Sequence, residues 1–334
     1  MSYTVSVIIP VYNAEKHLEN TIQSVINQSL GFENIELILV DDASKDNSKK
    51  IIESYSEKYD NIIPYYSEKN HGYPGFGRNI GLNIATSDYI MFMDNDDEYD
   101  EDMCKTMYET MIDEKADIVV CGRMMVNQSN NIEEKIPYVN GTEENDKIIL
   151  KNDELLYFNS HIILNKIFKN EIIKSNSLIF NEHSRLDDDM FTWDYFLNSE
   201  KMIYLNKYYG YRWNIRSDSL SHTNNVEYIP EIMDCIRYEF NQLKKFNKEQ
   251  HINFRAKNAI QWLIYETSFI SDSKKLKSIL KEIHDFEKEI NFNGKLIESW
   301  AKPINNLILR EHYKSAMILL KSLDVSRSAY RKLK

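Results

Sequence analysis

Short β-branched segments alternate with amphipathic helical segments along the first hundred residues, and this alternation constrains the fold more than any other feature of the sequence. The pattern predicts strands over residues 5–10, 35–40 and 62–66. It predicts helices between them, over 15–28 and from about residue 44 onward. Such βαβ units build a mostly parallel sheet flanked by helices, so we expect an α/β fold of the Rossmann-like type.

Two of the predicted strands end in acidic residues. Asp41 and Asp42 follow the strand 35–40, and the run 94–97 (Asp-Asn-Asp-Asp) follows a strand predicted over 89–93. Ligands of open α/β sheets bind outside the carboxyl ends of the strands, so both positions are candidate sites. Carboxylates two residues apart can hold one hard divalent cation, which also bridges to phosphates. The alternative for residues 94–97 is a solvated acidic turn that caps the next helix.

A second carboxylate cluster, Asp187 to Asp189, opens an amphipathic segment that contains Trp193. One interpretation is a general base that faces a sugar acceptor, with aromatic rings to stack on the apolar face of the sugar. The other is structural, because acidic residues in the first turn of a helix interact favourably with the helix dipole.

Residues 70–77 predict a polar loop that leads into a helix from about Arg78 to Ala85. Glycines at positions 75, 77 and 81 form a Gly-x-Gly-x-x-x-Gly pattern. A dinucleotide-binding oxidoreductase would carry such glycines directly after the first strand, whereas here they follow a polar stretch after the third. The sequence also lacks a Walker loop and a Gly-x-Ser-x-Gly elbow, so ATPase and α/β-hydrolase activities lose their main support.

Two arginines between residues 210 and 220 are candidates for phosphate binding. Arg212 and Arg216 can pair with diphosphate oxygens through their planar guanidinium groups. His222 is a further candidate metal ligand, and the alternative is a solvated or structural histidine.

Composition and charge exclude several classes of protein. The formal net charge is −11, from 41 Lys and Arg against 52 Asp and Glu. Nucleic-acid-binding proteins neutralise phosphates with clustered Lys and Arg, so we expect no nucleic-acid partner. Cys104, Cys121 and Cys235 are far apart, which indicates buried, reduced thiols. The first residues do not resemble a signal peptide, and the apolar runs fall short of the ~18 residues of a membrane span. We therefore expect a cytoplasmic protein.

A length of 334 residues suggests about two domains, and the sequence texture changes to helical after residue 225. Residues 1–224 carry a charge of −17 and residues 225–334 carry +6. Ile229, Met233, Ile236, Phe240 and Leu243 form an apolar helical stripe. We expect this stripe to face the domain core, and the alternative is a homo-oligomer interface.

The C-terminal end is basic and amphipathic. Apolar residues over 316–320 are flanked by Lys314 and Lys321, and four more basic residues lie between 327 and 334. Such an end can approach a polyanionic acceptor or the anionic inner face of the cell membrane, as a peripheral protein does. The alternative is a solvated helix face.

Six ordered segments together resemble the family 2 glycosyltransferases of GT-A fold. The matching segments are residues 7–13, 40–46, 77–81, 93–97, 165–168 and 186–191. The resemblance covers about residues 3–222. Pro74 and Gly75 before Arg78 make this loop similar to the branch that glycosylates wall teichoic acids and related cell-envelope polysaccharides. The resemblance implies a GT-A catalytic domain over 1–224, with nucleotide-sugar binding in 1–125 and acceptor binding in 126–224.

The resemblance also implies the reaction, an inverting transfer of a sugar from UDP-sugar, or another nucleoside diphosphate sugar, to a hydroxyl of a glycan, surface-polymer or lipid-linked acceptor. It implies that Asp188 is the general base, since the usual Glu-Asp pair of the family appears here as Asp187-Asp188. Asp189 is the alternative base, and Asp187 would lie on the acceptor side with Trp193. The remaining roles are donor binding by Pro10, Tyr12, Asp41, Arg78, Asp94, Asn95, Asp97 and Arg216, and ligation of Mn²⁺ or Mg²⁺ by Asp96 with His222 as a further candidate.

Two other functions remain as alternatives. A binding or scaffold module could keep the fold without catalysis, although such a module has no chemical need for the acidic motifs. A nucleotidylyltransferase would carry a Gly-rich, Arg-containing loop after the first strand, where Tyr12 and Asn13 stand instead.

Overall fold

The structure is a computed structural model that describes residues 3–127, 132–137, 145–158, 162–215, 228–290, 292 and 299–322. The chain forms two compact units, residues 1–219 and 220–334. The boundary predicted at 224/225 lies outside the described residues, so this boundary stays a prediction.

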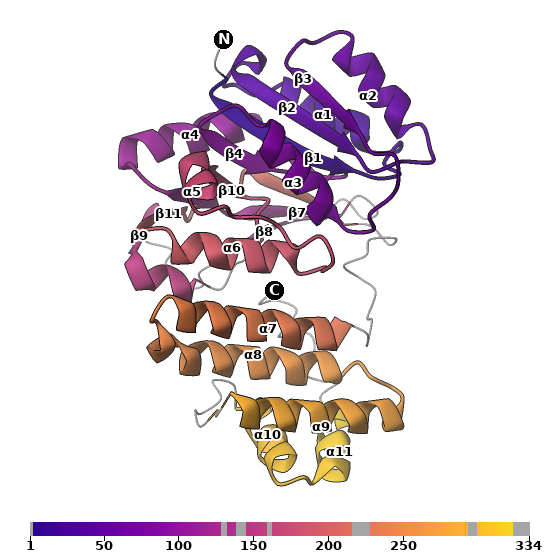
Figure 1. Ribbon diagram of the computed structural model, residues 1–334, viewed down its shortest axis with the longest axis vertical. Coiled ribbons are helices and arrows are strands. Elements are labelled where there is room, and N and C mark those ends of the chain that lie inside the picture. The colour runs from indigo at the N-terminus through magenta and orange to yellow at the C-terminus, as the bar shows by residue number, and fades with distance from the viewer. Residues whose placement is uncertain are drawn as a thin grey trace. The chain divides into compact units, whose positions relative to one another are not determined.

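A large mixed sheet forms the centre of the first unit. Among the described residues its strands run in the order β3-β2-β1-β4-β10-β6-β11-β9 (Figure 1). Their bounds are β1 Val5–Val11, β2 Ile35–Asp41, β3 Ile62–Tyr66, β4 Tyr89–Phe92, β6 Ile118–Cys121, β9 Lys147–Lys151, β10 Lys166–Lys169 and β11 Lys201–Leu205. Strand β10 is antiparallel to β4 and β6, and β9 is antiparallel to β11. The other described pairs are parallel, which confirms the predicted mostly parallel sheet.

A smaller sheet lies next to the acidic loop that follows β4. Its described strands run in the order β5-β12-β7-β8, with bounds β5 Glu98–Tyr99, β12 Tyr211–Ile215, β7 Arg123–Asn127 and β8 Ile132–Ile136. Strand β5 begins directly after residue 97 and pairs antiparallel with β12. This pairing brings residues 211–215 beside the acidic loop, although they are more than a hundred positions away in sequence.

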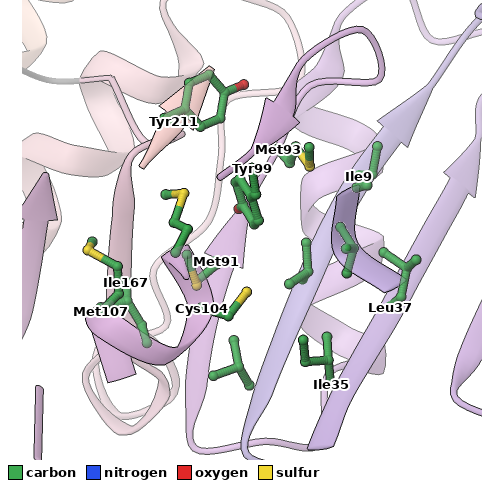
Figure 2. Close-up of a cluster of buried hydrophobic side chains, with 14 of the residues drawn as sticks. Ile9, Ile35, Leu37, Met91, Met93, Tyr99, Cys104, Met107, Ile167 and Tyr211 are labelled. Atoms are coloured by element: carbon green, nitrogen blue, oxygen red, sulfur yellow. The ribbon is translucent and has the colours of Figure 1, made fainter. Parts of the chain in front are cut away.

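Helices cover both faces of the large sheet. On one face α1 (Leu18–Ile26), α2 (Ser48–Ser56) and α4 (Met103–Glu114) pack over Ile9, Leu37 and Met91 in one hydrophobic cluster (Figure 2). On the other face lie α3 (Pro74–Ile84) and α6 (Asp187–Leu197). The short helices of this unit are η1 Phe32–Asn34, η2 Asn152–Tyr157 and α5 Asn170–Ser175.

Helix α3 begins earlier than predicted. The sequence predicted a polar loop to residue 77 and a helix from Arg78, whereas α3 starts at Pro74. Proline is favoured at the first helical position because its φ is already helical and its missing N–H would have no partner within the helix. The Gly-rich segment is therefore the first turn of a helix.

The second unit is helical, as predicted. Its described helices are α7 Tyr228–Lys245, η4 Glu249–His251, α8 Ile252–Thr267, α9 Ser273–Glu289, α10 Ala301–Leu309 and α11 Tyr313–Ser322. The stripe from Ile229 to Leu243 is buried within the chain, which confirms the core-facing interpretation. Ala316 and Leu320 of α11 are buried, whereas Ile318 is exposed. The basic residues 327–334 lie outside the described part of the chain.

Two further predictions concern cysteines and membrane spans. Cys104, Cys121 and Cys235 are buried thiols, as expected. Within the described residues, the helices are too short or too polar to cross a bilayer.

Candidate active site

The loops after β1 and β2 are joined by side-chain hydrogen bonds. Asn13 and Ala43 have φ angles of 49° and 58°, so the chain turns sharply after β1 and again after β2. Ser44 Oγ accepts from Asn13 N at 3.0 Å, and Asn13 Oδ1 accepts from Lys45 N at 2.8 Å. Glu15 Oε2 accepts from Asn47 N at 3.0 Å. These bonds hold the two loops together at the carboxyl ends of the neighbouring strands β1 and β2.

The residues predicted to hold the nucleotide base lie at this edge. Asp41 is the last residue of β2, and burial raises the pKa of its carboxyl, which is partly offset by hydrogen bonds from Ser44. Tyr12 follows β1 directly and its side chain is 39% exposed, so its ring is accessible to a ligand. Pro10 lies in β1, where Gly77 of α3 is so near that a Cβ added there would be 2.9 Å from the Pro10 Cβ.

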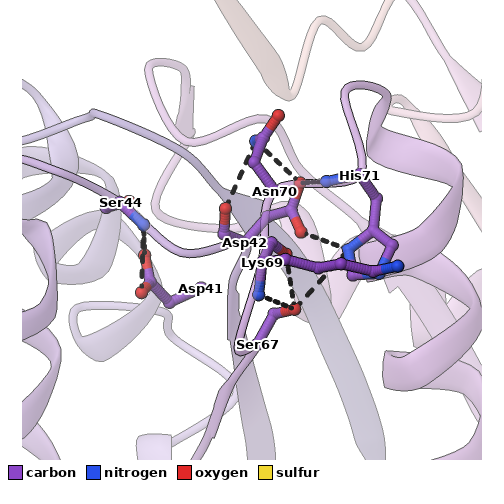
Figure 3. A network of polar contacts seen from close by, with 7 residues as sticks. All are labelled: Asp41, Asp42, Ser44, Ser67, Lys69, Asn70 and His71. Carbon is purple, nitrogen blue, oxygen red and sulfur yellow. Dashed lines mark hydrogen bonds and ion pairs between the residues drawn. The ribbon is translucent and has the colours of Figure 1, made fainter.

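Asp42 organises the loop that leads into α3 (Figure 3). Its Oδ2 accepts from His71 N at 2.8 Å and from Asn70 Nδ2 at 2.9 Å, and its Oδ1 lies 2.7 Å from His71 Nδ1. The His71 ring stacks on Phe76 at a centroid distance of 3.5 Å. Asp41 and Asp42 therefore have different surroundings: the first faces Ser44, and the second fixes the loop 67–76.

The acidic loop after β4 brings three carboxylates together. Asp94, Asp96 and Asp97 each place a carboxylate oxygen within 4.8 Å of the others. Asp94 is 40% exposed, so it can reach a ligand. Asn95 Nδ2 donates to the carbonyl of Pro10 at 3.1 Å, which connects this loop to β1. Closely spaced carboxylate oxygens fit a hard divalent cation such as Mn²⁺ or Mg²⁺.

Asp97 is the buried member of the three. Its Oδ2 accepts from the Tyr211 hydroxyl at 2.5 Å, and its Oδ1 accepts from Asn214 N at 2.8 Å. Burial, reinforced by Asp94, raises the pKa of Asp97 to about 7 against the opposing effect of these hydrogen bonds. Asp97 therefore attaches the loop to β12, and Asp94 and Asp96 are the carboxylates better placed to bind a ligand.

Arg78 connects the acidic loop to the start of α6. Its Nη1 donates to Asp187 Oδ2 at 2.6 Å, and its Nη2 donates to Asp94 Oδ1 at 3.2 Å. The guanidinium is buried, and the two carboxylates raise the pKa of Arg78 against the opposing effect of burial. The two carboxylate clusters, which lie about ninety positions apart in sequence, thus form one site.

The first turn of α6 presents carboxylates in two environments. Asp187 is buried against Arg78, whereas Asp188 and Asp189 are partly exposed. Asp189 N donates to Asp188 Oδ1 at 3.0 Å. The protein groups packed around the Asp188 carboxyl reduce its solvation, and this effect, followed by the charges of Asp189 and Asp187, raises the pKa of Asp188 well above its usual range.

Two predicted acceptor residues are buried in the structure. Trp193 is 0% exposed and lies in the core, so its ring offers no surface to an acceptor. The reason is that α6 buries residues on almost all of its sides. Asp187 is also buried, and its Oδ2 accepts a hydrogen bond from Arg78, so this carboxylate is engaged within the chain.

The predicted cationic residues are only partly placed. Arg216 and His222 lie outside the described residues. Arg212 Nη2 pairs with Glu133 Oε1 of β8 at 2.6 Å, so this guanidinium is engaged within the small sheet. Sequence reasoning missed Tyr211 and Asn214, which hold Asp97. The signal for them was weak because they lie on a strand far along the chain.

Comparisons with known proteins identify the family. The family described as Glycosyl transferase family 2 matches residues 6–170, which include the strands and loops just described. Residues 6–170 of this chain belong to glycosyl transferase family 2. The minor teichoic acid biosynthesis protein GgaA of Bacillus subtilis (strain 168) is 33% identical to it over 254 residues, 73% of this chain and 55% of that protein.

Another relative extends along most of the chain. The poly(ribitol-phosphate) beta-N-acetylglucosaminyltransferase TarP of Staphylococcus aureus (strain N315) is 25% identical over 314 residues, 91% of this chain and 94% of that protein. The first three curated relatives are longer proteins, of which this chain spans 34%, 33% and 24%.

A solved structure confirms the predicted fold of this family 2 chain. S. aureus TarS 1-349 in complex with UDP-GlcNAc superposes with a TM-score of 0.77 at 19% identity, over 97% of this chain and 92% of that one. The fold is therefore GT-A, with a helical C-terminal region, as the sequence predicted.

Proposed function

We propose that this chain is an inverting glycosyltransferase that moves a sugar from a UDP-sugar to a hydroxyl of a surface polymer. One observation carries the proposal: Arg78 donates hydrogen bonds to both Asp94 and Asp187. These bonds bring the candidate donor-binding loop close to the first turn of α6, which carries the candidate general base Asp188. The UDP-GlcNAc complex of TarS and the name of TarP, a poly(ribitol-phosphate) beta-N-acetylglucosaminyltransferase, support UDP-GlcNAc as the first donor and poly(ribitol phosphate) as the first acceptor to try.

The donor would bind along the carboxyl edge of β1, β2 and β4. Asp41 would accept a hydrogen bond from uracil, beside the exposed ring of Tyr12 and near Pro10. Asp94 and Asp96 would hold Mn²⁺ or Mg²⁺, which when bound stabilises the negative charge on the departing diphosphate. Arg78 would orient Asp94 toward the donor. Arg216 and His222 stay predictions for the diphosphate and the metal.

Asp188 would remove the proton from the acceptor hydroxyl. A general base works best when its pKa lies near the working pH, and the raised pKa of Asp188 moves it in that direction. Asp187, paired with Arg78, would fix the first turn of α6 so that Asp188 faces the donor. A base and a leaving group on opposite faces of the sugar give a single displacement with inversion at the anomeric carbon.

The test is UDP release from UDP-GlcNAc with Mn²⁺ and poly(ribitol phosphate), followed by assignment of the product anomer by NMR. Absence of transfer with a panel of nucleotide sugars would contradict the glycosyltransferase proposal. A product with retained configuration would contradict the single displacement alone.

Two variants separate donor binding from proton removal. We expect Asp96→Ala to lose Mn²⁺-dependent UDP binding in calorimetry. We expect Asp188→Asn to keep UDP binding and to lose transfer by about 10²- to 10⁴-fold, the usual contribution of a positioned base. Retained transfer in Asp188→Asn, together with loss in Asp189→Asn, would assign the base to Asp189.

A further inference from the structure

The side chain of Asn79 pairs with the backbone of a distant segment. Asn79 Oδ1 accepts from Phe180 N at 2.8 Å, and its Nδ2 donates to the Phe180 carbonyl at 3.0 Å. Nδ2 also donates to Glu182 Oε1 at 2.9 Å. The amide thus satisfies both backbone groups of Phe180, as a neighbouring strand would.

The ring of Phe180 connects this contact to α6 and β4. It is buried and stacks on Phe191 with a centroid distance of 4.0 Å and an interplanar angle of 7°. Its edge-to-face contact with Phe92 has a centroid distance of 5.1 Å. Phe191 lies one helical turn after Asp188, and Phe92 lies two residues before Asp94. Fixing Phe180 therefore fixes the packing below both carboxylate clusters.

The first turn of α3 lies close against the same segment. A Cβ added at Gly75 would be 2.6 Å from the Asn181 carbonyl oxygen and 3.3 Å from Asp187 Oδ2. Any side chain at position 75 would therefore separate α3 from residues 180–187. With the Arg78–Asp187 bond, α3 contacts this segment at its backbone and at the first turn of α6.

We infer that Asn79 is a positioning residue for Asp188, acting through Phe180 and Phe191 to set the placement of α6 beside the acidic loop. Arg78 acts on the Asp187 carboxylate, whereas Asn79 acts on the preceding backbone, so neighbouring residues of α3 perform two separate tasks. The inference rests on the proposed glycosyltransferase activity, in which Asp188 is the base.

The experiment compares Asn79→Ala with the wild type in kcat, in donor affinity and in hydrogen exchange. We expect kcat to fall by roughly 10- to 100-fold, because small displacements of a catalytic group have effects of that size. UDP affinity should change much less than kcat, since the residues proposed to bind uracil lie on β1 and β2 and the acidic loop is also held to β12 through Asp97. Exchange should become faster in peptides from residues 178–190 and should not change in peptides from β1 and β2.

Asn61→Ala is the matched control. Asn61 Nδ2 donates to the Phe32 and Ile35 carbonyls, both at 2.8 Å. This contact lies at the amino ends of β2 and β3, whereas the proposed site lies at the carboxyl ends of the strands. The Asn61→Ala variant therefore loses a comparable set of amide-to-backbone hydrogen bonds, and it should keep the wild-type kcat. As a second variant, Asn79→Asp keeps the acceptor for Phe180 N and replaces the Nδ2 donor by a carboxylate oxygen, and it should also lower kcat.

The outcomes separate the two proposals. A wild type without transfer would overturn the proposed function. An active wild type with undiminished kcat in both Asn79 variants would overturn the positioning role alone. An equal fall of kcat in Asn61→Ala would also overturn it, because the loss would then follow from general destabilisation.

Discussion

Tyr211 donates a hydrogen bond of 2.5 Å to Asp97 Oδ2 across 114 positions of sequence. The bond attaches β12 to the acidic loop, and the Asp94 backbone N–H lies 3.5 Å from the same hydroxyl. One phenol thus contacts both ends of the loop that carries the candidate metal ligands. The position of these ligands depends on a strand of the small sheet.

We predict that Tyr211→Phe weakens Mn²⁺ binding to the UDP complex by about 10- to 100-fold, the usual effect of removing a group that orients metal ligands. Calorimetric titration of Mn²⁺ in the presence of UDP measures it. Tyr99→Phe is the control, because the Tyr99 hydroxyl donates to the Phe92 carbonyl at 2.9 Å and its ring packs on Tyr211. Equal losses in both variants would point to general loosening of this core.

A second prediction concerns the charge balance around Arg78. Arg78→Met leaves the buried Asp187 carboxylate without its counter-charge, and removal of one partner of a buried pair costs about 3–5 kcal/mol. Arg78→Lys keeps the charge but cannot bond to Asp187 and Asp94 in the same fork geometry, so it should cost less stability and still lower transfer. Urea unfolding and UDP release measure the two effects.

The control for Arg78 is a surface ion pair. Lys147 Nζ lies 3.2 Å from Glu114 Oε1, and the Lys147 side chain is 45% exposed. Lys147→Met should change the free energy of unfolding by less than about 1 kcal/mol. A similar small change in Arg78→Met would show that the Arg78–Asp187 pair contributes little to stability.

A third prediction concerns the packing of α3 on the sheet. A Cβ at Gly81 would clash with Cγ2 of the buried Ile8 side chain. Alanine favours a helix over glycine by about 1 kcal/mol, but overpacking a core costs about 1–3 kcal/mol, so we expect Gly81→Ala to be destabilising. In a double-mutant cycle with Ile8→Ala the combined loss should be smaller than the sum. Asn83→Ala, at an exposed position of the same helix, should not destabilise.

The strands β1 to β3 were predictable because their apolar runs are bounded by turn residues and alternate with amphipathic helices. Strand β10 was not predicted. It is four residues long and begins and ends with lysine, and its antiparallel position between β4 and β6 is decided by tertiary pairing. Local sequence patterns contain no information on such pairing.

The site was predictable where acidic residues follow strands, as at Asp41 and Asp94. The sequence could not distinguish the buried side chains of α6 from side chains that face a ligand. Trp193 and Phe191 occur in a helix that buries residues on almost all of its sides, so no polar face marks the direction of the site. The Arg78–Asp187 and Asn79–Phe180 contacts join segments about a hundred positions apart, and only the fold brings them together.

A last prediction concerns the helical unit, where Glu287 of α9 is 2% exposed. Burial raises the pKa of Glu287 to about 7 from its usual 4.5, although the nearby Asn305 side chain opposes the shift. The folded state therefore holds a proton between these pH values that the unfolded state releases. We expect the contribution of Glu287 to stability to be greatest below pH 4.5, to fall as the pH rises, and to level off above about 7, with a total change on the order of 3 kcal/mol.

Glu287→Gln should remove this dependence, because glutamine stays neutral at every pH. Hydrogen exchange of peptides from α9 and α10, corrected for the intrinsic pH dependence of exchange, gives the local opening free energy at pH 5, 6 and 8. The opening free energy of the variant should exceed that of the wild type at pH 8 and should be close to it at pH 5. Glu282→Gln, at an exposed position of the same helix, should retain the wild-type slope. An unchanged slope in Glu287→Gln would show that another group titrates.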